Sequence, residues 1–239
     1  MSKLLKEINE NKNPQEFWSK YFSSIFAPYI SVLLIKLKVG PNIITLSMIP
    51  SSIICLYFSI FIFDNTINLF LISLIGVFIN IIDFVDGIVA RHSGMVSRYG
   101  KYLDRVCHYT ANPTIFLAYG IYSLQVEKNI TGFLFIIITI LDLFDAASKD
   151  FLFMIDINKE EFRYSKLRKP PFSIRDIRDH IIRIFFLPLT CIPHTILLLF
   201  PLFIYYDNLI FFYALLFLVQ LILKIIKRST NIRIKYDEK

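Results

Sequence analysis

Acidic residues and a histidine recur at helical spacing in the stretch DFVDGIVARHSGMVSRYGKYLDRVCH, residues 83–108. Asp83 and Asp86 are three residues apart, and Asp104 and His108 are four apart, so each pair lies on one face of a helix. A merely solvated helix end would not require this spacing. If the two helices are antiparallel neighbours, their faces converge into one pocket with three carboxylates and an imidazole.

Such a pocket indicates a particular chemistry. Three carboxylates repel one another, and hard divalent cations with oxygen ligands, Mg²⁺ by preference or Mn²⁺, would offset their charge. Arg91 and Arg98 flank the pocket and indicate an anionic substrate. Gly87 and Ala90 leave little side chain beside the aspartates, so a flat ligand could approach the backbone. Together these features are typical of phosphoryl chemistry on a diphosphate.

The elements that must position these residues are long apolar helices. The chain has 239 residues, of which 55% are hydrophobic. About 20 apolar residues suffice to cross a bilayer, and helices satisfy their own backbone hydrogen bonds in lipid. We therefore predict an all-α polytopic membrane protein with six transmembrane helices. The predicted spans are 42–63, 66–88, 101–124, 130–155, 182–205 and 208–226.

The segment before the first span predicts a helix lying flat at the membrane surface. Aromatic and apolar residues from Phe17 to Ile30 fall on one broad face, and Pro28 is expected to bend this amphipathic interfacial helix. The predicted organisation is an N-terminal cytoplasmic segment with the interfacial helix at 1–41, a transmembrane catalytic domain at 42–228 and a cytoplasmic tail at 229–239.

Basic residues set the orientation. Lysine and arginine cluster before the first span, between the second and third, between the fourth and fifth, and after the sixth, whereas Lys128 stands alone in the opposite loops. By the positive-inside rule, both termini and the acidic pocket face the cytoplasm of an integral cell-membrane protein. The net charge of +7 is thus mostly a topology signal, and a nucleic-acid partner is not expected.

Two further groups of polar residues are candidates. Asp142, Asp145 and Lys149 lie in the cytoplasmic half of the fourth span, where Asp145 and Lys149 could pair at i, i+4. Arg175 and Arg178 open the fifth span and oppose its dipole, which indicates either an anion such as an acceptor phosphate or a topology signal. The three cysteines, Cys55, Cys107 and Cys191, have no pair spacing and indicate packing residues. The other histidines, His92, His180 and His194, have no partner spacing that suggests metal binding.

The stretch from Asp83 to His108 resembles the signature of the CDP-alcohol phosphatidyltransferase family. That signature runs Asp, two residues, Asp-Gly, two residues, Ala-Arg, eight residues, Gly, three residues, Asp, three residues, Asp. The PNIIT element at residues 41–45 is also similar to the family. Seven of the eight signature positions match, namely Asp83, Asp86, Gly87, Ala90, Arg91, Gly100 and Asp104.

The resemblance implies transfer of a phospho-alcohol or phosphatidyl group from a CDP-linked donor, such as CDP-diacylglycerol, to a hydroxyl acceptor with release of CMP, in phospholipid or related polyol-phosphate biosynthesis. It also implies contact with membrane lipid and a homodimer. The donor would contact Asn42, Thr45, Asp83, Gly87, Ala90, Arg91 and Gly100. A Mg²⁺ or Mn²⁺ pair would be held by Asp83, Asp86, Asp104 and His108. Asp104 and His108 would be catalytic, and the acceptor would meet Lys149, Arg175 and Arg178.

His108 departs from the signature, because the fourth aspartate should stand there. An imidazole can act as a general base near neutral pH, but not while the same lone pair binds a metal. Three interpretations stay open: an enzyme with a histidine base, an enzyme with altered acceptor or metal use, and a non-catalytic CDP-binding homologue. A cation-coupled transporter is the alternative from another class, since carboxylates in membranes also mark ion paths.

Overall fold

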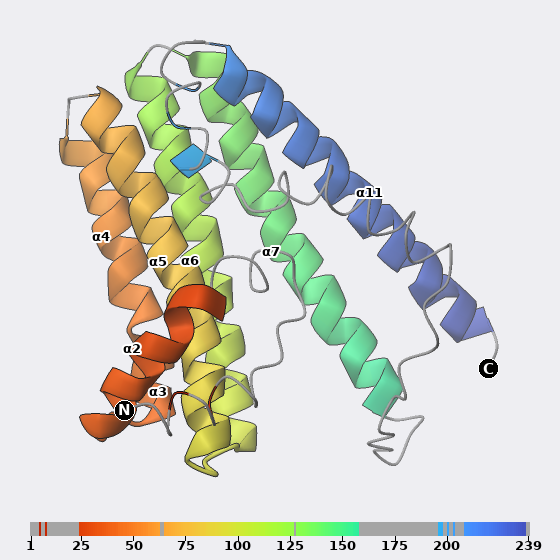
Figure 1. The fold of residues 1–239 in the computed structure, drawn as a ribbon. Helices are drawn as coiled ribbons and strands as arrows, with labels where there is room; N and C mark the ends of the chain where they lie inside the picture. The colour runs from red at the N-terminus through yellow and green to blue at the C-terminus, as the bar shows by residue number, and fades with distance from the viewer. Residues whose placement is uncertain are drawn as a thin grey trace, which may run out of the picture.

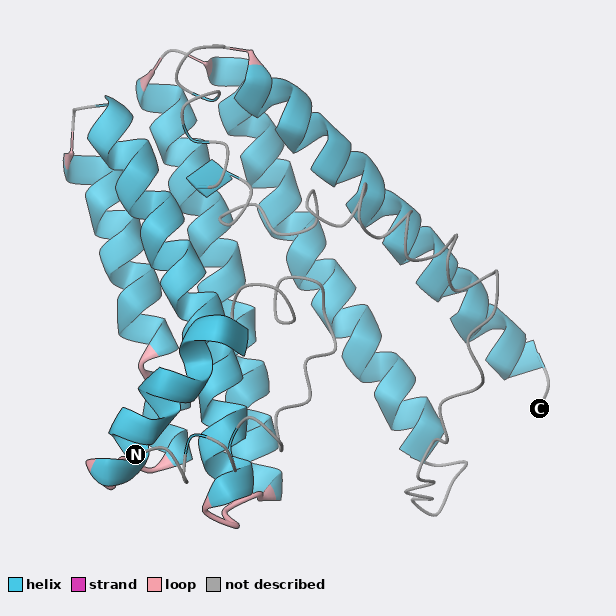
Figure 2. Ribbon diagram, in the orientation of Figure 1, coloured by secondary structure: helices cyan, strands magenta, loops and turns pink. Residues whose placement is uncertain are grey.

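The protein is described here by a computed structural model, in which the described residues are helical with no strand among them (Figures 1 and 2). These residues are 5, 8, 24–62, 65–126, 128–157, 196–197, 200, 203 and 208–237. The helices are α2 (Ser24–Lys36), α3 (Pro41–Leu46), α4 (Met48–Phe61), α5 (Asn65–His92), α6 (Arg98–Gln125), α7 (Asn129–Ile157) and α11 (Leu209–Asp237).

Among the described residues, four segments are long and apolar enough to cross a membrane: Pro41–Phe61, Thr66–His92, Asn129–Phe151 and Leu209–Ile226. They correspond to the first, second, fourth and sixth predicted spans and indicate a membrane protein. The third predicted span is α6, a helix of 28 residues, which is about 42 Å long. The first turns of α6 carry the charged residues of the pocket. These residues make α6 less apolar than the four segments above. The fifth predicted span, 182–205, lies almost wholly outside the described residues.

The helices pack side by side as a bundle (Figure 1). α4, α5 and α6 pack against one another, α7 packs against α6, and α11 packs against α7. Tyr119 of α6 is fully buried at the centre, where its hydroxyl lies 2.9 Å from that of Ser73 on α5. Its ring stacks on Phe135 of α7 with ring centroids 5.5 Å apart. One aromatic side chain therefore ties three helices together, since aromatic pairs and buried hydrogen bonds both favour a single packing arrangement.

The turn between α5 and α6 produces the antiparallel pair that the sequence requires. Gly94 has φ of +65°, a backbone conformation that glycine adopts without strain. Ser97 then caps α6, because its hydroxyl accepts a hydrogen bond of 2.9 Å from the Gly100 amide. The last turns of α5 and the first turns of α6 consequently lie together at one end of the bundle, as Figure 1 shows at its lower edge.

The short helix α3 lies at this same end. It starts after Gly40 with Pro41 as its first residue, a position where the missing amide hydrogen of proline costs nothing. α3 contacts both α5 and α6, which brings the PNIIT element beside the charged stretch.

The opposite end of the bundle is closed by side-chain amides. Asn68 of α5 donates a hydrogen bond of 2.8 Å to the carbonyl of Ile62, and Gln125 of α6 donates one of 2.9 Å to that of Ile60. Both carbonyls belong to the end of α4, where backbone groups lack helical partners. These amides therefore fix how α4 meets α5 and α6 far from the charged stretch.

The interfacial helix predicted before the first span is not confirmed. Residues 9–23 lie outside the described residues, and the described part is α2, which contains Pro28. Exposed side chains of α2 such as Phe26 and Leu33 are apolar, while Ser31 is buried, so α2 lacks the polar exposed face of an amphipathic helix. At the other end, α11 continues as a helix through the predicted tail as far as Asp237.

Candidate functional site

The structure brings Asp83 of α5 together with Asp104 and His108 of α6. His108 Nε2 lies 2.9 Å from Asp83 Oδ1 and 3.5 Å from Asp104 Oδ1. One ligand atom from each of the three residues lies within 4.8 Å of the others. The side chains are 35–41% exposed, so a small ligand can reach them.

His108 Nε2 and Asp83 Oδ1 are within hydrogen-bond distance of each other. In the neutral tautomer that donates from Nε2 to the carboxylate, Nδ1 holds the lone pair of the ring. The ring can accept a proton at Nδ1, or bind a cation at Nε2 after that hydrogen leaves. A neutral imidazole cannot do both at once. His108 therefore acts either as a general base or as a metal ligand.

Asp86, the fourth predicted metal ligand, has a different environment. Its side chain is buried, with the residue 9% exposed, and Oδ2 accepts a hydrogen bond of 2.5 Å from the Thr45 hydroxyl of α3. It is close enough to Asp83 and Asp104 for their charges to act on it, but it is not part of the group of three. The structure thus places Asp86 behind the cluster, held by the PNIIT element.

The group of three fits a divalent cation. Two carboxylates and one imidazole are oxygen and nitrogen donors suited to Mg²⁺ or Mn²⁺, with imidazole favouring the softer Mn²⁺. The three donor atoms of the predicted ligands Asp83, Asp104 and His108 lie close enough together to bind one cation. A second cation would need Asp86 as a ligand.

Gly87 was expected to leave an open face, and the structure fills that face with Arg91. A Cβ added at Gly87 would lie 3.2 Å from Arg91 Nη1 and 3.6 Å from Nη2, so the guanidinium lies over the glycine one turn earlier on α5. There it is close enough to Asp86 for the two charges to interact. A ligand that approaches Gly87 would meet a planar cation first, which suits a phosphate group. Ala90 is half-buried and Arg98 is exposed.

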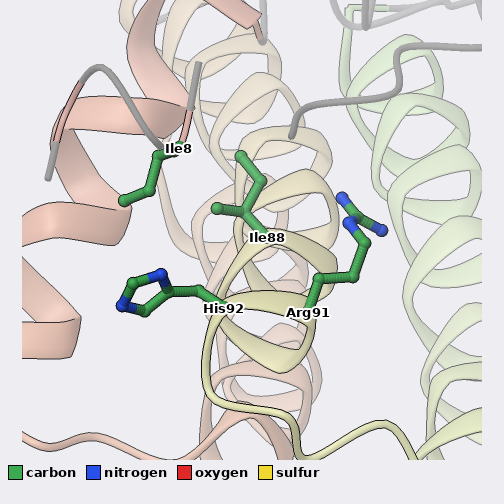
Figure 3. Close-up of a pocket in the computed structure, with 4 residues that line it drawn as sticks. All are labelled: Ile8, Ile88, Arg91 and His92. Carbon is green, nitrogen blue, oxygen red and sulfur yellow. The ribbon is translucent and has the colours of Figure 1, made fainter. Parts of the chain in front are cut away.

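A cavity of about 190 Å³ adjoins this arginine. It is lined by Ile8, Ile88, Arg91 and His92. Figure 3 shows Arg91 and His92 on different sides of the last turn of α5. Arg91 both lines this cavity and interacts through its charge with Asp86. The wall therefore combines apolar surface with a cation, a combination that can receive the uncharged part of an anionic ligand.

Asn42 and Gly100 lie close together, as expected for two predicted donor contacts. A Cβ added at Gly100 would lie 3.4 Å from Asn42 Oδ1 and 3.3 Å from Ser97 Oγ. The absence of a side chain at position 100 thus lets α3 approach the start of α6. Together with the bond from Thr45 to Asp86, this approach joins α3, α5 and α6 around the cluster.

The second predicted group lies on α7. Lys149 Nζ is 3.6 Å from Asp145 Oδ2, and Asp145 is 4% exposed, which confirms the i, i+4 pair. Asp142 lies near enough to Lys149, Lys224 and His108 for their charges to act on it, so Asp142 of α7 borders the cluster, and α11 packs against α7. Arg175 and Arg178 lie outside the described residues. Cys55 and Cys107 are buried, in keeping with packing roles.

Sequence reasoning missed Asp150. Its Oδ1 lies 2.6 Å from Arg105 Nη1, and its Oδ2 accepts a hydrogen bond of 2.8 Å from the Tyr109 hydroxyl. Arg105 and Tyr109 are four residues apart on α6 and each follows a member of the cluster, a spacing visible in the sequence. Their partner is 41 residues or more away along the chain, so only the packing of α7 on α6 reveals it.

Comparison with known proteins identifies the segment that holds this site. The family described as CDP-alcohol phosphatidyltransferase matches residues 38–147, and no curated protein matches the chain. The matched segment contains α3, α4, α5, α6 and most of α7, and hence the whole acidic cluster. This match confirms the resemblance that the signature predicted.

Proposed function

We propose, from the match of the CDP-alcohol phosphatidyltransferase family to residues 38–147, that the protein transfers a phospho-alcohol or phosphatidyl group from a CDP-linked donor to a hydroxyl acceptor. CMP is the second product, and the reaction serves phospholipid or related polyol-phosphate synthesis. The observation that carries the proposal is the grouping of Asp83, Asp104 and His108 within 4.8 Å at the junction of α5 and α6, inside the matched segment.

The donor occupies the surface made by α3, the end of α5 and the start of α6. Its diphosphate lies between the acidic cluster and Arg91, whose guanidinium already lies beside Gly87. Asn42, Ala90 and Gly100 are proposed as further donor contacts. The predicted contact Thr45 is buried and donates to Asp86, so it is proposed to act through that carboxylate. The cavity at Arg91 receives an uncharged part of the donor. Asp83 and Asp104, which belong to the group that could hold a divalent cation, would hold Mg²⁺ or Mn²⁺, and the cation would neutralise part of the diphosphate charge.

His108 receives the proton of the attacking hydroxyl. The acceptor oxygen forms a new bond to the β-phosphorus, the bond from that phosphorus to the bridging oxygen breaks, and CMP leaves with the bridging oxygen. Nδ1 of His108 is the lone-pair nitrogen while Nε2 donates to Asp83, so the carboxylate holds the ring and stabilises the imidazolium that forms. Asp104 Oδ1 lies 3.5 Å from His108 Nε2, so Asp104 also stabilises the imidazolium.

The acceptor approaches from the side of α7 and α11. Lys149 and Lys224 supply cations there, and Asp142 and Asp145 supply acceptors for hydroxyl groups; the nearby charges of Asp142 and His108 support this placement. Arg175 and Arg178 are proposed to bind an acidic group of the acceptor.

The protein spans the cell membrane six times, with α6 and the segment 182–205 as the third and fifth spans. Both termini, and the site, face the cytoplasm. The α5–α6 turn and the C-terminal ends of α2 and α11 all lie toward the lower side of the molecule in Figure 1, and the basic residues near them support this orientation. We further propose contact with membrane lipid and a homodimer.

The test is CMP release by purified protein in detergent with Mg²⁺ or Mn²⁺, using CDP-diacylglycerol and a panel of soluble CDP-alcohols. Asp83→Asn and Asp104→Asn are expected to lower the rate about a hundredfold or more, as loss of a charged group that acts in a transition state does. Thr114→Val is the control, because this hydroxyl on α6 donates to its own helix at Thr110. Full activity of the aspartate variants, or no donor turned over or bound by wild type, would refute the proposal.

One observation favours a second candidate, a CDP-binding homologue without turnover: the imidazole at position 108 instead of the signature's carboxylate. His108→Asp separates the two. A gain of CMP release on this substitution indicates a site that has lost its base, and a loss indicates that the histidine is the working base.

A further inference from the structure

Asp150 of α7 makes a two-sided contact with α6 directly beside the acidic cluster. One carboxylate oxygen lies 2.6 Å from Arg105 Nη1, and the other accepts the 2.8 Å hydrogen bond from Tyr109. Arg105 follows Asp104 in the chain, and Tyr109 follows His108. Both oxygens of Asp150 are therefore engaged by residues that follow Asp104 and His108 in the chain, and Asp150 itself lies outside the group of three.

This contact is too exposed to serve mainly as a stabiliser of the fold. The side chains of Arg105 and Asp150 are 45% and 24% exposed, and ion pairs of that kind contribute little to stability. The α6–α7 interface has a stronger anchor in the buried Tyr119 and Phe135 rings. What the pair does determine is where the guanidinium lies.

The position of that guanidinium matters because Arg105 also acts electrostatically on Asp104. A flexible arginine released from Asp150 has Asp104, its neighbour in sequence, as an alternative carboxylate partner. Guanidinium groups bind carboxylates through both oxygens, the same atoms that a divalent cation requires. Arg105 and a metal ion would then compete for one ligand.

We propose that Asp150 is a positioning residue for the metal site: it holds the Arg105 guanidinium away from Asp104 and so leaves the Asp104 oxygens to a divalent cation. This inference rests on the proposed function, because it takes Asp104 as a metal ligand. The observations beneath it are the 2.6 Å ion pair and the place of Arg105 beside the cluster. Tyr109 orients the second oxygen and carries no charge, so it provides a matched comparison.

The experiment is Mn²⁺ binding by the full chain in detergent, measured from the loss of the free-ion electron paramagnetic resonance signal. Asp150→Asn is expected to weaken Mn²⁺ binding by about three- to fivefold, the upper range for a half-exposed charge pair. Arg105→Gln is expected to bind at least as tightly as wild type. The double variant Asp150→Asn/Arg105→Gln is expected to return to the affinity of Arg105→Gln, because the competing cation is gone.

Each alternative outcome has a defined meaning. Wild type that binds no Mn²⁺ overturns the metal site of the proposed function and this inference with it. Wild type that binds Mn²⁺, together with unchanged binding in Asp150→Asn or weak binding in the double variant, overturns this inference alone. Equal weakening by Tyr109→Phe would show that helix packing, rather than Arg105, is responsible. If Asp150→Asn does not fold, weaker binding by Arg105→Gln alone still contradicts the proposal.

Discussion

Gly87→Ala is the substitution that best separates a binding role from a structural one. Gly87 lies in the interior of α5, where alanine is favoured over glycine by about 1 kcal/mol of helix propensity. The new methyl group would lie 3.2 Å from Arg91 Nη1, a few tenths of an ångström tighter than ordinary contact. That neighbour is the far end of a flexible side chain and can shift. We expect the free energy of unfolding to stay equal or rise by up to about 1 kcal/mol.

Activity should respond in the opposite direction. If the donor diphosphate lies between Arg91 and the acidic cluster, the methyl group enters the space of the ligand and displaces the guanidinium that meets it. Overpacking of a closely fitted surface costs about 1–3 kcal/mol, which corresponds to a fall in kcat/KM of about 5- to 150-fold.

The assay pairs CMP release at varied donor concentration with reversible unfolding in mixed micelles of detergent and sodium dodecyl sulfate. The reasoning fails if Gly87→Ala turns over donor as fast as wild type, because the Gly87 face would then carry no ligand. It also fails if the variant unfolds readily, because the glycine would then be required by the packing of α5 itself.

Two further substitutions test the packing that holds the site. Gly132→Ala on α7 would place a methyl group 2.6 Å from Leu124 Cγ and 3.1 Å from the Gly120 carbonyl oxygen, so the unfolding free energy should fall by about 1–3 kcal/mol; the same unfolding assay checks this, and CMP release per folded molecule should be unchanged. Thr45→Val removes the hydroxyl that donates to the buried Asp86 and should lower the unfolding free energy by about 1–3 kcal/mol. Thr45→Ser keeps the hydroxyl and should have an unfolding free energy near that of wild type. Equal stability of the two variants would argue against this hydrogen bond.

Local spacing was enough to predict the central part of the site. Asp83 and His108 sit on helices joined by a short turn, so their side chains could be expected to meet once antiparallel packing was assumed. The hydrophobic runs likewise predicted four helices that the structure shows to be long and apolar, because a span requires only length and composition. α6 shows the limit of that rule, since its charged first turns reduce its apolar character while it remains a full-length helix.

Other features depended on contacts between distant parts of the chain. Gly87 and Ala90 were expected to form an open surface, yet Arg91 folds back over Gly87, a side-chain choice that spacing does not reveal. Asp86 was expected to share the metal site equally with Asp83, but α3 buries it and supplies Thr45 as its partner.

The sequence by itself determined that acidic residues and a histidine stand at the adjoining ends of two helices in the order of a known signature, because helical periodicity follows from the backbone alone. Tertiary structure decided which of these groups point at one another, which are buried, and where Arg105 finds its partner. Those outcomes depend on how α3 and α7 pack against α5 and α6, and that packing is the sum of many weak contacts between residues far apart in the chain.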